Sequence, residues 1–115
     1  LNDTGLILEI IDRVVFNHSI DESRIYLTGW SNGCSLSQKL ANEHSDVFAA
    51  IACMSYYLLD DPSPQYSPIP IMEIHGLEDQ IILYSNDAIH LPNMDAQKHG
   101  ALQNLQQWGQ MNGCT

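Results

Sequence analysis

The chain has 115 residues, 44% hydrophobic and 16% charged, a composition typical of a globular domain rather than a disordered or fibrous chain. Four basic side chains against fourteen acidic ones give a formal net charge of −10. We therefore expect neither nucleic acid nor a membrane as partner, because both attract clusters of Lys and Arg. The sequence also lacks an apolar run of about 18 residues, the length that spans a bilayer.

Hydrophobic periodicity and turn residues divide the chain into alternating helices and strands. In chain order, the predicted elements are a helix at 3–18, a strand at 25–28, a helix at 32–44, strands at 48–55 and 69–76, and a helix at about 95–112. The segment 56–70 holds four of the five prolines and is predicted to be irregular. This alternation indicates a parallel α/β sheet.

Three of these elements carry more specific expectations. The helix at 3–18 has an apolar face wide enough for burial on more than one side, with Asp3 as its N-cap. The strand at 48–55 is a continuous apolar run, which is typical of a parallel strand buried on both faces. The last helix is expected to end with Gly113 in the C′ position. Its buried face is expected to consist of Ala101, Leu105 and Trp108.

The pentapeptide G-W-S-N-G at 29–33 joins a predicted strand to a predicted helix. This is the pattern of a nucleophile elbow, in which a serine stands at the carboxyl edge of a sheet and at a helix N-terminus. We therefore predict Ser31 as a nucleophile and the backbone N–H of Asn32 as an oxyanion donor. Side chains at Gly29 and Gly33 are expected to collide where strand and helix pass each other. The alternative is a tight turn whose serine only caps the helix.

A serine nucleophile requires a base that is itself held by an acid. In hydrolases with this elbow, the chain order is serine, acid, histidine. The segment H-G-L-E-D at 75–79 follows the third predicted strand, so its acids are expected at the same sheet edge as the elbow. From position alone, Glu78 and Asp79 are both candidates.

These motifs resemble those of the polyhydroxybutyrate depolymerase-like esterases, α/β-hydrolases that include feruloyl and acetylxylan esterases. The resemblance covers almost the whole chain. The matching segments are R-I-Y-L-T-G-W-S-N-G at 24–33, F-A-A-I-A at 48–52, P-I-M-E-I-H-G-L-E-D at 70–79 and W-G-Q-M-N-G-C at 108–114. It places Ser31 on the nucleophile of the family and Asp79, rather than Glu78, on its acid. Cys34 stands where the family usually has a glycine, and we expect only a small packing adjustment there.

The resemblance implies a partial α/β-hydrolase fold, three-layered with a parallel sheet and truncated at both ends. Residues 1–115 would be the central part of one such domain. The implied activity is hydrolysis of carboxylic esters of the polyhydroxyalkanoate, feruloyl or acetyl-polysaccharide type, without cofactor or metal, in a secreted protein. The catalytic histidine would follow a further strand beyond Thr115, so these 115 residues alone are expected to be inactive.

Several residues have two interpretations. His75 is expected to support the acid loop, and His90 or His99 would be the base only if the base lies within the chain. Trp30, Tyr56 and Tyr57 lie at the expected substrate edge and serve either substrate contact or packing. Cys53 is expected to be a buried thiol that acts as a small hydrophobe. Cys114 is expected to pair with a cysteine outside the chain. Two alternative functions remain. One is a catalytically silent α/β-hydrolase that binds a ligand, and the other is a prolyl-oligopeptidase-type peptidase.

Overall fold

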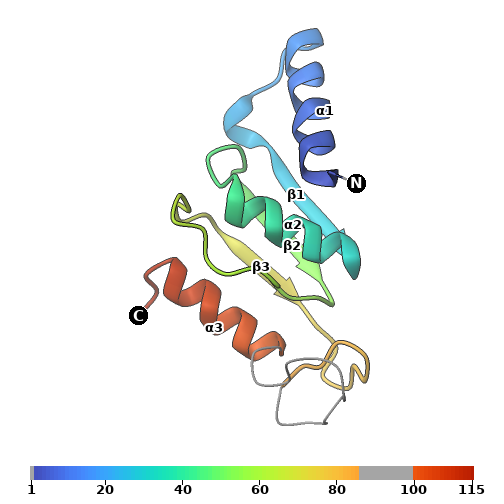
Figure 1. Cartoon of the computed structure of the whole chain (residues 1–115), viewed down its shortest axis with the longest axis vertical. Helices are drawn as coiled ribbons and strands as arrows, with labels where there is room; N and C mark the ends of the chain where they lie inside the picture. The colour runs from blue at the N-terminus through green and yellow to red at the C-terminus, as the bar shows by residue number, and fades with distance from the viewer. Residues whose placement is uncertain (1, 86–99) are drawn as a thin grey trace.

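The computed structural model describes residues 2–85 and 100–115 (Figure 1). In chain order, its elements are α1 (Asp3–Asn17), the short 3-10 helix η1 (Glu22–Arg24), β1 (Tyr26–Trp30), α2 (Asn32–Glu43), β2 (Ala50–Met54), β3 (Ile71–Ile74) and α3 (Ala101–Met111). The predicted order of helices and strands is confirmed. The start predicted for the last helix, at about residue 95, lies outside the described residues.

The three strands form one parallel sheet in the order β1-β2-β3. Gly29 of β1 pairs with Cys53 of β2, and Met54 of β2 pairs with Ile74 of β3. Because all three strands run in the same direction, their carboxyl ends meet at one edge of the sheet. The structure thus has the parallel sheet expected of a partial α/β fold, but helices cover only one of its faces among the described residues, so the predicted third layer is not present there.

One face of the sheet carries the core. Helix α2 packs on β1 and β2, and α3 packs on β3 (Figure 1). The buried core cluster consists of Leu40, Ala41, Phe48, Ile51, Leu58, Ile69 and Trp108. Strand residues that point toward this face, such as Ile51 and Cys53, are buried. The apolar residues of the helices and of the strands are therefore joined in one layer on this side.

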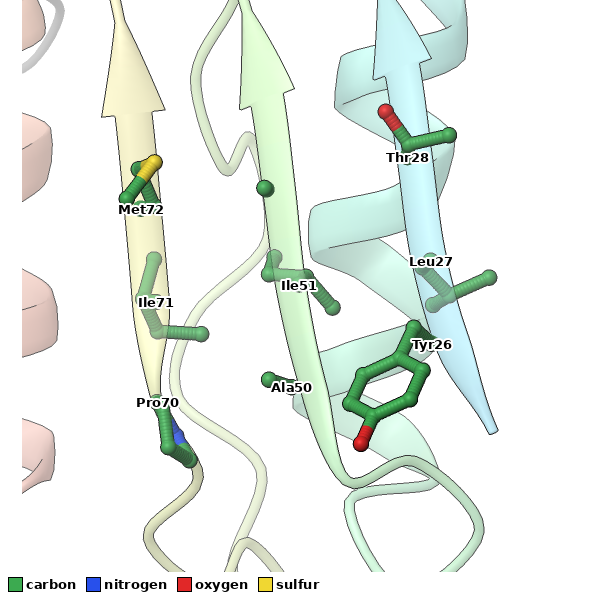
Figure 2. A pocket seen from close by; sticks show the side chains of 9 residues that line it. Tyr26, Leu27, Thr28, Ala50, Ile51, Pro70, Ile71 and Met72 are labelled. Atoms are coloured by element: carbon green, nitrogen blue, oxygen red, sulfur yellow. The ribbon is translucent and has the colours of Figure 1, made fainter. Parts of the chain in front are cut away.

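The opposite face of the sheet is open. Figure 2 looks onto this face, with α2 behind the strands and the labelled side chain of Tyr26 in view. A hollow of about 480 Å³ lies over it, lined by residues of all three strands. Ala50 and Ala52 are only half-buried, and Met54 is exposed. The expectation that strand 48–55 is buried on both faces is therefore wrong for this structure, because no described element covers the second face.

Helix α1 is also less buried than its sequence predicts. None of its residues is buried, although Ile7, Leu8 and Ile11 pack against the core cluster. Its large exposed side chains are Leu6, Ile10, Val14 and Phe16. Burial on more than one side is therefore wrong here, since the described chain offers a partner on one side only. None of the described helices is long and apolar enough to cross a bilayer.

The helix ends correct one further expectation and confirm another. Asn2, not Asp3, is the N-cap of α1, and its side chain accepts a hydrogen bond from the Gly5 amide at 3.0 Å. Asp3 is instead the first helical residue, where its charge complements the helix dipole. Gly113 follows α3 with φ 65°, which confirms its predicted C′ role.

The buried face of α3 differs from the prediction at one position. Ala101 and Trp108 are buried as expected, but Leu105 is 51% exposed. Asn104 is buried in its place. Asn104 is buried because it makes hydrogen bonds, described below, to groups on the sheet side of the helix.

Candidate active site

Ser31 lies at the corner between β1 and α2. Its backbone angles, φ 54° and ψ −123°, are ones that residues other than glycine rarely adopt. The Ser31 amide donates to the Met54 carbonyl at 3.0 Å, and the Ser31 carbonyl accepts from the Cys34 and Ser35 amides at 2.8 and 3.1 Å. The Ser31 side chain makes no capping hydrogen bond to α2 in the described structure. Helix capping therefore does not explain a serine at this strained corner.

Asn32 is the first residue of α2. Backbone N–H groups in the first turn of a helix have no carbonyl of their own helix to bond. The Asn32 amide thus lies next to Ser31 at the positive end of the helix dipole, where an oxyanion is favoured. This is the position that the sequence predicts for an oxyanion donor.

The two glycines of the elbow differ in how closely other atoms approach them. A β-carbon on Gly29 would lie 2.3 Å from the carbonyl carbon and oxygen of Gly33 and 2.7 Å from the Cys34 nitrogen. A β-carbon on Gly33 would meet no atom within 4 Å. The expected collision is present at Gly29, but the expectation is wrong at Gly33. The backbone of Gly33 approaches Gly29. The direction in which a β-carbon on Gly33 would point is open.

This difference gives a matched pair of variants. We expect Gly29→Ala to lower the free energy of unfolding of the full-length protein by about 2 kcal/mol or more, because the clash is with backbone that cannot move aside. Gly33→Ala should change it by less than about 0.5 kcal/mol. Urea denaturation measures both. Equal losses in the two variants would contradict the close approach at Gly29.

Asp79 lies in the turn after β3, which we call the acid turn (residues 76–82). Its Oδ1 accepts hydrogen bonds from the amides of Ile81 and Ile82, both at 2.9 Å. Burial acts to raise the pKa of Asp79, but the amide bonds and nearby His75 outweigh it, so this pKa lies below its ordinary value. Oδ2 lies 3.7 Å from His75 Nε2, beyond hydrogen-bond distance. Asp79 is thus an ionised carboxylate with one oxygen held by the backbone.

The sheet brings Ser31 and Asp79 to the same edge. Ser31 follows β1 and Asp79 follows β3, with β2 between the two strands. Adjacent strands are about 4.8 Å apart, which separates the outer two by about 10 Å. In a Ser-His-Asp triad, an imidazole hydrogen-bonded on both sides fills the gap between the serine and the acid.

None of the described histidines is placed to fill that gap. His44 caps the far end of α2, roughly 18 Å along the helix from Ser31, and His18 caps the end of α1. His75 is 3% exposed at its side chain, and its Nε2 is bonded to the Ile82 carbonyl. His90 and His99 lie outside the described residues.

The three aromatic candidates for the substrate edge have different surroundings. Tyr57 is 2% exposed, and its hydroxyl donates to the Leu83 carbonyl, so its contacts favour packing over substrate contact. Tyr56 is partly buried. Trp30 is 73% exposed, so packing against the described part of the chain does not account for it.

A disulfide joins Cys34 and Cys53 behind the elbow, with Cα atoms 5.0 Å apart. The expectation of a lone buried thiol at Cys53 is therefore wrong. Cys53 pairs in register with Gly29, so the elbow brings the first turn of α2 and its Cys34 over Cys53. Cys114 is a free, exposed thiol within this chain.

A buried polar network that the sequence pattern does not reveal lies beneath the elbow and the acid turn. Gln38 Oε1 accepts from Trp108 Nε1 at 2.8 Å and from Asn104 Nδ2 at 2.9 Å. Gln38 Nε2 donates to the Tyr56 carbonyl at 3.0 Å, and Asn104 Nδ2 also donates to Glu73 Oε2 at 2.7 Å. The network connects the helix that starts at the elbow with the strand that leads to the acid turn.

One signal in the sequence points to this network. Asn104 lies between Ala101 and Trp108 at helical spacing, and Gln38 lies three residues before Ala41 on the inner face of its helix. A polar residue on an apolar helix face needs a buried partner. Its partner, however, cannot be named without the fold. Among the described residues, no cluster of His, Cys, Asp or Glu could hold a metal ion.

Comparison with known proteins relates the chain to a family of esterases. The family model described as "Esterase PHB depolymerase" matches residues 2–111. A feruloyl esterase B from Piromyces equi is 26% identical over 99% of this chain and 22% of its own length. A bifunctional acetylxylan esterase/xylanase from Neocallimastix patriciarum is 30% identical over 84% of this chain and 14% of its own length. A poly(3-hydroxyalkanoate) depolymerase C from Paucimonas lemoignei is 44% identical over 40% of this chain and 11% of its own length.

The chain therefore spans less than a quarter of the length of each of these three relatives. No solved structure matches it significantly. The family match covers nearly every residue from α1 to the end of α3 and includes both the elbow and the acid turn. The chain belongs to the Esterase PHB depolymerase family.

Proposed function

We propose that the protein is a serine hydrolase that cleaves carboxylic esters, with Ser31 as nucleophile and Asp79 as the acid of a Ser-Asp-His triad. The observation that supports this most is the Ser31 backbone, held at φ 54° at the carboxyl edge of the sheet with its side chain unused for capping. A strained serine next to free helix amides is the arrangement of a nucleophile elbow.

In the proposed reaction, Ser31 Oγ attacks the ester carbonyl carbon while a histidine takes the hydroxyl proton. The Asn32 amide donates to the carbonyl oxygen as negative charge develops on it. The C–O bond to the alcohol breaks, and the histidine returns the proton to the departing alcohol. Water then attacks the acyl group on Ser31 by the same route and releases the acid.

Asp79 would orient the histidine and stabilise its positive charge. Its Oδ1 is already occupied by the Ile81 and Ile82 amides, which leaves Oδ2 to accept from the base. We propose that this base, and a second oxyanion donor, come from outside residues 1–115, because the family resemblance places the base after a further strand and the described histidines are engaged elsewhere. The chain alone would then be inactive.

The names of the relatives suggest the substrate class. They act, by name, on feruloyl esters, acetylated xylan and poly(3-hydroxyalkanoate). We propose an ester of this group, a polyester or an acylated polysaccharide, as the substrate. A structural disulfide such as Cys34–Cys53 persists in oxidising compartments, which supports secretion.

A fluorophosphonate probe, which reacts with activated serines, tests the assignment in the full-length protein. After reduction and tryptic digestion, the label should be found on Ser31 within the peptide 25–39. Ser35 and Ser37 lie in the same peptide and serve as internal controls. Labelled protein should lose turnover of p-nitrophenyl acetate, methyl ferulate and acetylxylan together. A native protein that remains unlabelled, or is labelled only elsewhere, would refute the proposal.

A further inference from the structure

Glu73 and His75 form a buried pair immediately before the acid turn. They lie two residues apart at the end of β3, so their side chains share one face of the strand. The side chains are 6% and 3% exposed, and Glu73 Oε1 lies 3.4 Å from His75 Nδ1. Neither atom has another hydrogen-bond partner among the described residues. Two buried polar atoms facing each other in this way are costly unless a proton lies between them.

The partners on the other sides of the pair fix where the protons are. His75 Nε2 lies 2.5 Å from the Ile82 carbonyl, which can only accept, so Nε2 carries a proton. Glu73 Oε2 accepts from Asn104 Nδ2 at 2.7 Å. The orientation of that amide is set in turn by the Leu58 N–H, which donates to Asn104 Oδ1 at 2.9 Å.

A neutral imidazole beside an ionised Glu73 cannot satisfy both sides of the ring. It has a single N–H, whereas the Ile82 carbonyl and Glu73 Oε1 are both acceptors. One further proton between His75 Nδ1 and Glu73 Oε1 completes both hydrogen bonds. Burial raises the pKa of the Glu73 carboxyl, against the opposing effects of Asn104 and His75, and so favours keeping that proton.

We propose that Glu73 and His75 are positioning residues that hold the acid turn through one shared proton. This inference rests on the function proposed for Asp79. Ile82 links the pair to the acid, because its carbonyl accepts from His75 and its amide donates to Asp79 Oδ1. When the shared proton is lost to solvent, the remaining ring N–H moves to Nδ1 to face Glu73. The bond to the Ile82 carbonyl then breaks, and the amide that orients Asp79 is released.

Among the described residues, the other titratable side chains that face His75 are Tyr57, Tyr84 and Asp79. The Tyr57 ring lies parallel to the imidazole with ring centres 6.0 Å apart, and the Tyr84 ring centre lies at 6.3 Å. Burial raises the pKa of the Tyr57 hydroxyl, and that of Asp79 lies below its ordinary value. The described residues of α2 and α3 contribute only neutral amides to the network. A control variant must therefore exclude Tyr84 as the source of any alkaline fall in kcat.

Glu73→Gln tests the shared proton with almost no change of shape. The glutamine carbonyl can accept from Asn104, and its amide can donate to His75 Nδ1, so the clamp on Ile82 needs no titrating proton. We expect kcat of the wild type for p-nitrophenyl acetate to fall on the alkaline side, as the shared proton is lost. Glu73→Gln should stay within about 3-fold of the wild type at neutral pH and lack this fall. Tyr84→Phe should keep it.

Two kinetic results would overturn the proposal: a wild type without the alkaline fall, or a Glu73→Gln variant that retains it. His75→Phe, which preserves a ring beside Tyr57 but loses the bond to Ile82, should lower kcat by about 10-fold or more with KM changed by less than about 3-fold. A loss confined to KM would also count against positioning of the acid.

Nitrogen-15 NMR of labelled histidine gives a readout that does not depend on ester turnover. In the wild type, the His75 ring should change from a proton on Nε2 to a proton on Nδ1 alone as pH rises. The midpoint of this change should coincide with the midpoint of the fall in kcat. In Glu73→Gln, Nε2 should keep its proton throughout, and His75→Phe identifies the signals. A wild-type Nε2 that never loses its proton refutes the shared proton even if ester turnover is normal. Absence of any Ser31-dependent turnover refutes the proposed function instead.

Discussion

Replacing Ser31 with alanine should lower kcat for p-nitrophenyl acetate in the full-length protein by about 10⁴-fold or more, because alanine removes the attacking oxygen. The free energy of unfolding should change by less than about 0.5 kcal/mol. The serine side chain makes no capping hydrogen bond to lose, and alanine has the same β-carbon at the strained φ of 54°. Steady-state kinetics and urea denaturation measure the two effects separately.

Ser35→Ala is the matched control for this variant. Ser35 lies one helical turn further along α2, and its backbone amide also bonds to the Ser31 carbonyl. We expect its turnover to stay within about 2-fold of the wild type. If Ser31→Ala keeps the wild-type rate, or if both variants lose activity equally, the elbow is not the site of nucleophilic attack.

The elbow and the order of elements could be predicted because their signals are local. A strand, a glycine turn and a helix follow one another within twenty residues, and the serine corner is where the chain must change direction. The requirement for Gly33 could not be judged in the same way. Whether a β-carbon fits depends on the direction in which it points, and the pattern G-x-S-x-G does not contain that direction.

Burial was predicted less well than secondary structure. The apolar residues of α1 and β2 show which surfaces can be buried, but not which of them are covered by the elements at hand. Phe16 of α1 is 89% exposed and Met54 of β2 is exposed, although both belong to strongly apolar segments. Composition of a segment therefore sets a capacity for burial, and the arrangement of neighbouring elements decides how much of it is used.

The disulfide and the polar network depend on contacts between distant parts of the chain. Cys34 and Cys53 are 19 residues apart, and they meet only because Cys53 pairs with Gly29 in the sheet. Gln38 and Asn104 are separated by 66 residues. Pairings of this kind follow from register and helix packing, neither of which a single sequence specifies by pattern alone.

Asp79→Asn should lower kcat by about 10⁴-fold with the fold preserved. The Ile81 and Ile82 amides both donate to Oδ1, so an asparagine must place its oxygen there and turn its NH₂ group toward the base. A donor then faces the ring nitrogen that should donate, and the histidine is held in the wrong tautomer. Glu78→Gln, which changes the exposed neighbouring carboxylate, should leave kcat within about 2-fold.

The pH dependence of this pair gives a further check. The pKa of Asp79 in the folded protein lies below its ordinary value, so its ionised form contributes stability that is present above the unfolded pKa and is lost as pH falls through the folded one. The stability difference between wild type and Asp79→Asn should therefore begin to shrink only as pH falls below about 4. Any acid limb of kcat/KM above that pH belongs to the histidine base rather than to Asp79. An Asp79→Asn variant within about 10-fold of the wild-type kcat would remove Asp79 from the triad, since no histidine could then depend on its charge.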